Sequence, residues 1–188
     1  MGIIAPIRYI TLLLLAFNCL SLDGLFTLVA VTKKMDLKNN YKYINVTATL
    51  NEIGPIANHS IDVEIEVLKE LRVVKLYGYY HLVLNGSVVP NAFFRRTVDI
   101  CHFLKRPTSD RLYNLLYVRL KQNNRLAERC PMPPGHYYIR GFRPSSVEIP
   151  GFLPENDFLL KQVYQIGINN EPLVVHNFYG RFVRLTSD

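Results

Sequence analysis

The stretch Ile61-Asp62-Val63-Glu64-Ile65-Glu66-Val67 alternates strictly between apolar and acidic residues. Successive side chains of a β-strand point to opposite faces, so this period of two gathers the apolar side chains on one face and the carboxylates on the other. The stretch therefore predicts a half-buried strand whose apolar face packs on a core.

The same pattern continues on both sides of this stretch. Residues 43–50 alternate between apolar and polar side chains, and residues 73–84 form a longer run rich in valine, leucine and tyrosine. Asn85-Gly86 follows that run and is a strong hairpin signal. We therefore expect residues 88–100 to be the returning strand.

One helix and three more strands are predicted in the second half. Apolar residues at helical spacing follow Pro107, a capping residue (Thr108 or Ser109) and Asp110; they are Leu112, Leu115, Leu116 and Leu120. Alternating or β-rich runs predict strands at 136–139, 158–168 and 173–185. Helices between most strand pairs, which a parallel α/β fold needs, are missing. The order of elements thus predicts a mainly β fold, either a β-sandwich or an open barrel, with one short amphipathic helix inserted.

The first 24 residues have the parts of a secretory signal peptide. A short basic segment is followed by an apolar stretch beginning at residues 9–17 and then by small or polar residues. A second apolar run over 25–31 leaves a signal anchor as the alternative. Asp23 interrupts such a span at a cost of about 2.5–3.5 kcal/mol, which favours cleavage, between Cys19 and Leu25. We expect a signal peptide over 1–24, one domain over 25–188, and no stable membrane span.

Cleavage removes Cys19 and leaves Cys101 and Cys130 in a compartment that oxidises thiols. Two cysteines permit a single pairing, and two free buried thiols are the alternative. Three acceptor motifs for N-glycosylation support the same compartment: Asn45-Val46-Thr47, Asn58-His59-Ser60 and Asn85-Gly86-Ser87. The sequence therefore predicts a secreted, extracellular glycoprotein with one disulfide.

The chain has 188 residues, 49% of them hydrophobic, and a formal net charge of +7. Excess positive charge favours anionic partners in general. A pattern of phenylalanine beside arginine at 93–96, 140–143 and 181–184 would suggest nucleic-acid binding in an intracellular chain. The leader argues against that partner, and strand alternation sends phenylalanine to the core and arginine to water. We expect that nucleic acid is not a partner of this protein.

Catalytic motifs are missing from the sequence. It contains no Gly-x-Ser-x-Gly, His-Glu-x-x-His or phosphate-loop motif, and its five histidines stand singly without metal-ligand spacing. His81 and His176 fall inside predicted strands and are expected to be ordinary surface or core-edge residues. We therefore predict no enzymatic activity, no catalytic residues, no metal and no cofactor.

The cysteine blocks carry a family resemblance. Val98–Lys105, the following amphipathic helix, Cys130-Pro131 and Gly135–Ile139 resemble a large insect family of secreted proteins. That family carries a domain of unknown function and is related to the ML lipid-recognition superfamily. The resemblance covers Ile44 to Leu185 and implies an immunoglobulin-like sandwich of two antiparallel sheets with an apolar cavity between them. Relatives are associated with lipid or pheromone handling, several of them in chemosensory tissue.

The resemblance implies a binder of a lipid or small hydrophobic ligand, with an extracellular receptor as a further partner. Candidates to line its cavity are Val63, Ile65, Leu82, Leu84, Phe103, Tyr138, Ile139, Tyr164, Ile166 and Phe178. The alternative is an extracellular protein–protein interaction module in which the same side chains fill the core. A carrier should show an enclosed pocket of about 300 Å³ or more between the sheets.

Overall fold

The structure is a computed structural model that describes residues 26–122, 124–147, 149 and 153–186. The signal peptide predicted over 1–24, with Cys19 inside it, lies outside the described residues. Cleavage and secretion therefore stay predictions.

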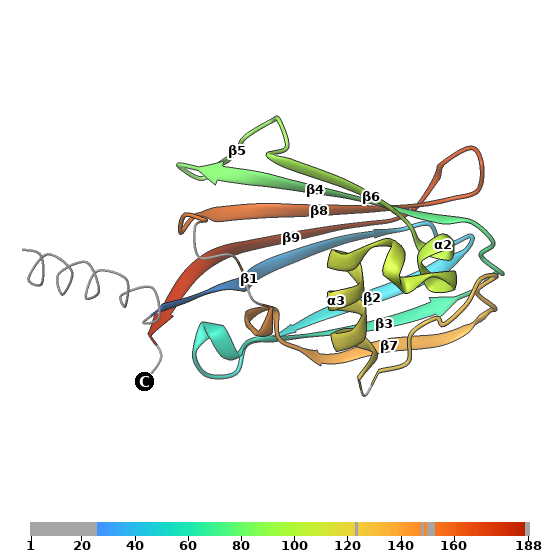
Figure 1. Ribbon diagram of the computed structural model, residues 1–188, viewed down its shortest axis with the longest axis horizontal. Coiled ribbons are helices and arrows are strands. Elements are labelled where there is room, and N and C mark those ends of the chain that lie inside the picture. Colours follow the sequence, from blue (N-terminus) through green and yellow to red (C-terminus); the bar gives the residue numbers. More distant parts are fainter. Residues whose placement is uncertain (1–25, 123, 148, 150–152, 187–188) are drawn as a thin grey trace, which may run out of the picture.

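The described strands form two antiparallel sheets, which confirms the predicted sandwich (Figure 1). The larger sheet contains β1 (Phe26–Asn39), β9 (Glu171–Thr186), β8 (Asp157–Ile166) and β4 (Val74–Leu84) in that order, with β5 (Ser87–Val88) and β6 (Phe94–Asp99) both paired to β4. The smaller sheet contains β2 (Ile44–Asn51), β3 (Ser60–Val67) and β7 (Gly135–Phe142). The strictly alternating stretch at residues 61–67 belongs to β3, the central strand of the smaller sheet.

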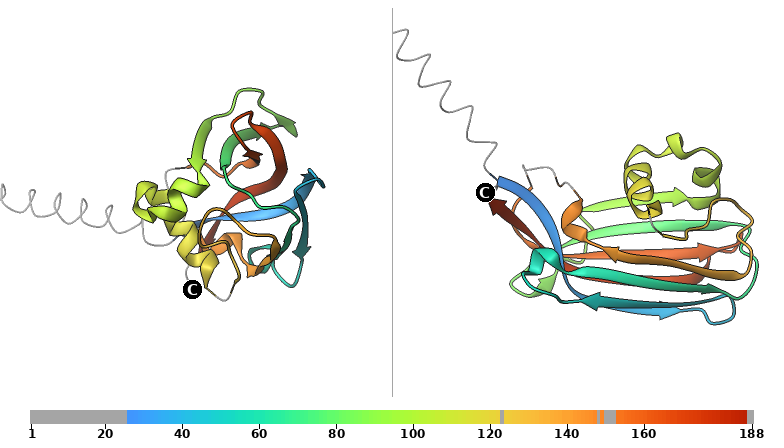
Figure 2. Two further views of the ribbon diagram at one scale, coloured as in Figure 1. Left: turned by 90° about the vertical axis from the view of Figure 1, so that its right-hand side faces the viewer. Right: turned by 90° about the horizontal axis from the view of Figure 1, so that it is seen from below.

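Two α-helices close the remaining side of the sandwich. They are α2 (Ile100–Lys105) and α3 (Arg111–Lys121). The described residues also contain three short 3-10 turns: η2 (Ile56–Asn58), η3 (Pro107–Ser109), which lies between the two helices, and η4 (Pro144–Ser146). Seen end-on in Figure 2, the two sheets face each other and the two helices lie along one side of the sandwich. We call residues 100–121 the flap.

Several predicted boundaries were wrong. The region 88–100 is not one strand, because β5 ends at Val88 and β6 begins only at Phe94. The last residue of that region, Ile100, begins α2, a second helix that was not predicted. The strand β1 was not predicted either.

The predicted helix exists as α3, with a different cap and a different buried face. The carboxylate of Asp110 caps it by accepting from the backbone N–H of Tyr113 at 2.9 Å. Leu112 and Leu115 were expected on the buried face, but they are 49% and 60% exposed. Tyrosines occupy the inward positions instead.

The structure contains the predicted disulfide between Cys101 and Cys130, whose Cα atoms are 5.4 Å apart. It joins the first turn of α2 to the segment that leads into β7. Beside it, Phe103 is 1% exposed and packs edge-on against Tyr113 and Tyr117, with ring centroids 4.7 and 5.3 Å away. Covalent and aromatic contacts therefore both hold the flap on the sandwich.

Candidate functional site

Strand register identifies the side chains that face the space between the sheets. Cross-strand partners point to the same face of a sheet. Leu76 of β4 pairs with Tyr164 of β8, which pairs with Val174 of β9. All three belong to the main core cluster or pack against it, so their face is the inner one.

Buried residues form two separate clusters on this inner surface. The larger one lies under the flap and includes Leu76, Phe103 and Val174. The smaller one consists of Leu28, Phe158 and Phe182, with Tyr80 and other partly buried residues against it. Other buried apolar residues, among them Val31 and Ile61, belong to neither cluster.

An apolar band between the sheets keeps exposed surface. On the larger sheet it is the row Met35–Phe178–Leu160, and on the smaller sheet the row Ala48–Val63–Ile139. Met35 lies four residues before the end of β1 and Ala48 four residues after the start of β2, so the two rows sit at the same level. All six side chains are only partly buried although they face inward. We call these six residues the inner band.

The ten predicted cavity residues fall into three groups. Five are in the main core cluster or packed against it: Val63, Ile65, Phe103, Tyr164 and Ile166. Three face inward on strands and are partly exposed: Leu82, Ile139 and Phe178.

Burial raises the pKa of the Tyr164 hydroxyl to about 12, as expected for a phenol deep in the core.

The remaining two, Leu84 and Tyr138, do not line the interior. Leu84 is 56% exposed at the β4–β5 turn. Tyr138 pairs with Glu64 on the outer face of the smaller sheet, and the Arg140 guanidinium lies over its ring at 4.4 Å. Neighbours on a strand point to opposite faces, so Tyr138 and Ile139 cannot both face the cavity.

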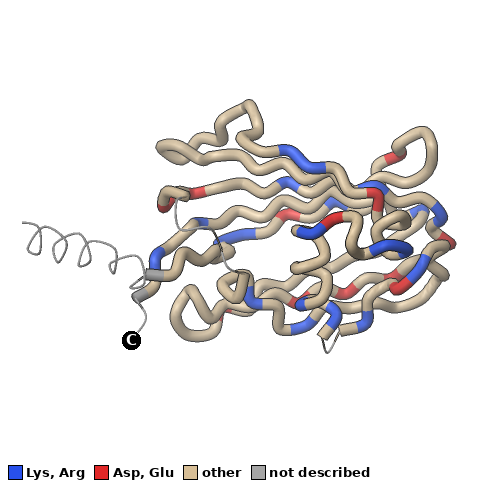
Figure 3. Tube along the Cα trace, viewed as in Figure 1, with Lys and Arg blue, Asp and Glu red and all other residues tan. Residues whose placement is uncertain are grey.

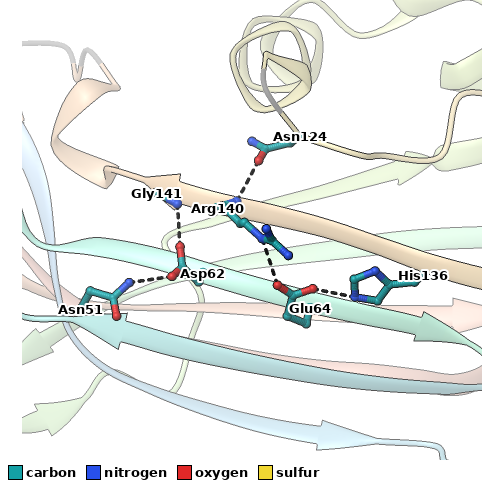
Figure 4. A network of polar contacts seen from close by, with 7 residues as sticks. All are labelled: Asn51, Asp62, Glu64, Asn124, His136, Arg140 and Gly141. Carbon is teal, nitrogen blue, oxygen red and sulfur yellow. Dashed lines mark hydrogen bonds and ion pairs between the residues drawn. The ribbon is translucent and has the colours of Figure 1, made fainter.

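Polar residues cover the outer face of the smaller sheet (Figure 4). Glu64 accepts a hydrogen bond from Arg140 Nε at 3.2 Å and lies 2.6 Å from His136 Nε2. Asp62 accepts from the backbone N–H of Gly141 at 2.6 Å and from Asn51 at 2.8 Å, and these bonds lower the pKa of its carboxyl. This network ties β3 to β2 and β7 on the side away from the core.

Two open pockets on the described part of the chain were compared with the predicted apolar pocket, and neither matches it. The first, of about 420 Å³, lies on this polar outer face beside Glu64, Glu66 and His136. The second, of about 760 Å³, is lined mainly by polar and charged side chains between the end of α3 and β7. Neither pocket is enclosed by the inner faces of the two sheets.

The three predicted glycan acceptors are accessible. Asn45 is partly exposed on β2 and borders the first pocket. Asn58 and Asn85 are exposed, at the end of η2 and in the β4–β5 turn. Glycosylation at these sites stays a prediction.

The charge is not focused in one site. Figure 3 shows lysine and arginine spread over both sheets and the flap. Among the described residues, no group of three or more His, Cys, Asp or Glu is placed to hold a metal ion. Within the same ranges, no helix has the length and apolar character needed to cross a bilayer.

Exposed apolar side chains gather on the outer side of α3. Leu112, Leu115 and Val118 are 49%, 60% and 51% exposed and follow one another at intervals of three residues. This spacing places them on one side of the helix, away from the tyrosines that face the core.

Comparison with known proteins addresses the cysteine blocks directly. Residues 88–160 match the family model DUF1091. It is described as a protein of unknown function, and the matched segment contains the flap and both cysteines. The match confirms the predicted resemblance to a family of unknown function over that segment. No curated protein sequence matches the chain.

Solved structures similar to this chain include the following two. One is chicken MD-1 complexed with lipid IVa, with a TM-score of 0.39 and 11% identity over 83% of this chain and 97% of that one. The other is a Niemann-Pick type C2 protein from Japanese carpenter ant, with a TM-score of 0.36 and 10% identity over 81% of this chain and 92% of that one.

Proposed function

We propose that this chain is a secreted, non-enzymatic protein that binds a lipid or small hydrophobic ligand between its two sheets, at the inner band. One observation carries the proposal: six apolar side chains that face the interior retain exposed surface, and only two of them, Val63 and Leu160, pack against a buried cluster. Apolar surface in water is unfavourable by about 25 cal/mol per Å². An apolar ligand that covers the band removes this cost.

The surroundings of the band support a binding role. The flap packs on the main core cluster, which Val63 of the band also contacts, so residues beside one end of the band are already in place. The chemosensory or pheromone role implied by the family resemblance is part of the same proposal. The proposal also includes an extracellular location, which the Cys101–Cys130 disulfide supports.

Filling the band tests the proposal. Ala48→Trp places a large side chain at the centre of the band, whereas Thr49→Trp places the same group on the outer face of β2. We expect Ala48→Trp to weaken binding of the fluorescent hydrophobe N-phenyl-1-naphthylamine at least about tenfold, or 1.4 kcal/mol. Thr49→Trp should change it less than about twofold. Equal binding by both variants would place the probe elsewhere.

Native mass spectrometry of protein from the culture medium tests the function without a chosen probe. A copurifying lipid supports the carrier role, and N-terminal sequencing of the same sample should begin between Leu20 and Phe26. Protein that keeps Met1 and stays in membranes would favour the signal anchor.

The alternative function is an extracellular protein–protein interaction module. The exposed stripe of Leu112, Leu115 and Val118 favours it, since large exposed apolar patches mark interaction surfaces. It becomes the better account if the wild-type protein binds no hydrophobic probe and carries no lipid.

A further inference from the structure

One row across the inner face contains two polar side chains, which lie between Leu37 of β1 and Gly78 of β4. Gly78 of β4 pairs with Gln162 of β8, and Gln162 pairs with His176 of β9. The neighbouring rows contain Tyr164 with Val174 on one side and Leu160 with Phe178 on the other. His176 and Gln162 therefore lie directly beside the inner band and on the same face.

His176 is buried and lacks a partner. It is 6% exposed, and its Nε2 atom has no hydrogen-bond partner among the described residues. The ring of Phe178, a member of the inner band, lies 3.7 Å from the imidazole centroid. More than nine in ten buried polar groups are hydrogen-bonded in native proteins, so an orphaned ring nitrogen beside a ligand site points to a partner that the ligand supplies.

The chemistry of this position favours an uncharged partner. Burial lowers the pKa of His176 to about 4, so the imidazole is neutral at pH 7 and offers one donor and one acceptor nitrogen. The nearest cation in the row is Arg96, which pairs with Gly78. Its guanidinium already binds both carboxylate oxygens of Asp110, at 3.0 and 2.7 Å. A buried carboxylate would thus lack a counter-ion and be costly.

There is room beside Gln162. The residue opposite it, Gly78, has no side chain, and a Cβ built there would meet nothing closer than the Arg96 carbonyl oxygen at 3.9 Å. Gln162 itself is partly exposed. A ligand group can therefore contact the Gln162 amide next to His176.

We propose that His176 and Gln162 bind the polar end of the ligand, an uncharged hydroxyl or carbonyl group on a long-chain hydrophobe whose chain lies on the inner band. This inference rests on the proposed function and specifies its ligand class: an amphipathic molecule such as a long-chain alcohol, rather than a pure hydrocarbon or an ionised fatty acid.

The experiment compares three ligands of equal chain length. Hexadecan-1-ol, hexadecane and palmitate compete with N-phenyl-1-naphthylamine for the wild-type protein, for His176→Phe and for Gln162→Leu. His102→Phe is the matched control because His102 is exposed on α2. Circular dichroism melts check that each variant folds.

The wild type should prefer hexadecan-1-ol over hexadecane and palmitate by about tenfold, the value of one net hydrogen bond. His176→Phe should remove that preference and leave hexadecane binding unchanged, Gln162→Leu should reduce the preference, and His102→Phe should keep it. Equal competition by hexadecan-1-ol and hexadecane, or an equal loss of both in His176→Phe, would overturn the inference but leave the proposed function standing. If the wild type does not bind the fluorescent probe at all, the proposed function itself fails.

Discussion

Removing the disulfide should destabilise the protein by an amount that the fold allows us to work out. Cys101 and Cys130 are 29 residues apart in the chain. Closing a loop of that length lowers the entropy of the unfolded chain by about 12 cal/mol/K, or about 3.6 kcal/mol at 25 °C. We therefore expect Cys101→Ala/Cys130→Ala to lose about 3.6 kcal/mol of unfolding free energy.

The native fold should survive this change. Phe103 still packs against the two tyrosines of α3, and the backbones of Met132 and Leu71 still exchange two hydrogen bonds of 2.9 Å. Both ends of the loop are thus held by contacts that do not involve sulfur. The loss should come mainly from the freer unfolded chain.

Urea unfolding followed by circular dichroism measures the difference, and the melting temperature should fall by about 7–14 °C. Wild-type protein reduced with dithiothreitol is the control and should match the double alanine variant. A loss below about 1 kcal/mol, or a variant that differs from the reduced wild type, would refute the unfolded-state argument.

Three further predictions concern single residues. Gly180→Ala should cost about 1–3 kcal/mol in urea unfolding because its Cβ would overlap the Val31 carbonyl oxygen and the Phe158 ring, whereas Gly78→Ala should stay within about 1 kcal/mol. Asp110→Ala should lose about 1–2 kcal/mol, since it removes both the α3 cap and the Arg96 partner; Asp110→Asn, which can still cap, should recover part of this. Because the pKa of His176 is lowered in the folded protein, the unfolded chain takes up a proton there at higher pH than the folded chain does. The free energy of unfolding should therefore fall by about 3 kcal/mol as the pH drops from 6.5 to 4. If His176→Phe shows the same dependence of unfolding free energy on pH, this prediction is contradicted.

Most strands could be predicted from the sequence because alternation is a local property. The strand β1 could not, and two physical features explain why. Its first apolar residues follow directly on the leader and extend that apolar region, so they were considered as part of a membrane anchor. Its alternation is then broken by a bulge between Thr32 and Lys34. A bulge shifts every later side chain to the other face, which hides a period of two.

The buried face of α3 could not be predicted from the sequence, for a different reason. Leucines at helical spacing predicted the helix correctly but not its buried face, because tertiary contacts decided which side of the helix turned inward. The Arg96–Asp110 pair fixes the first turn against β6, and the Tyr117 hydroxyl donates to the backbone oxygen of Ala127 at 3.2 Å. Tyrosine can bury its ring and still satisfy its hydroxyl at the edge of the core, which leucine spacing does not reveal.

One residue of the candidate site, His176, could have been recognised from the sequence. His176 was interpreted as an ordinary surface or core-edge residue inside a predicted strand, because none of the five histidines has metal-ligand spacing. Its own strand carried the missing signal: Val174, His176 and Phe178 alternate with their neighbours and so share one face. A histidine on the same face as a valine and a phenylalanine must be buried if that face is the core, and it must then find a partner. Which face is inner depends on the pairing of Leu76 with Tyr164 and of Tyr164 with Val174, and the first of these joins residues 88 positions apart in the chain. The polar end of the proposed ligand site therefore depends on how strands pair across the sheet. The periodicity of one strand could suggest that site but not establish it.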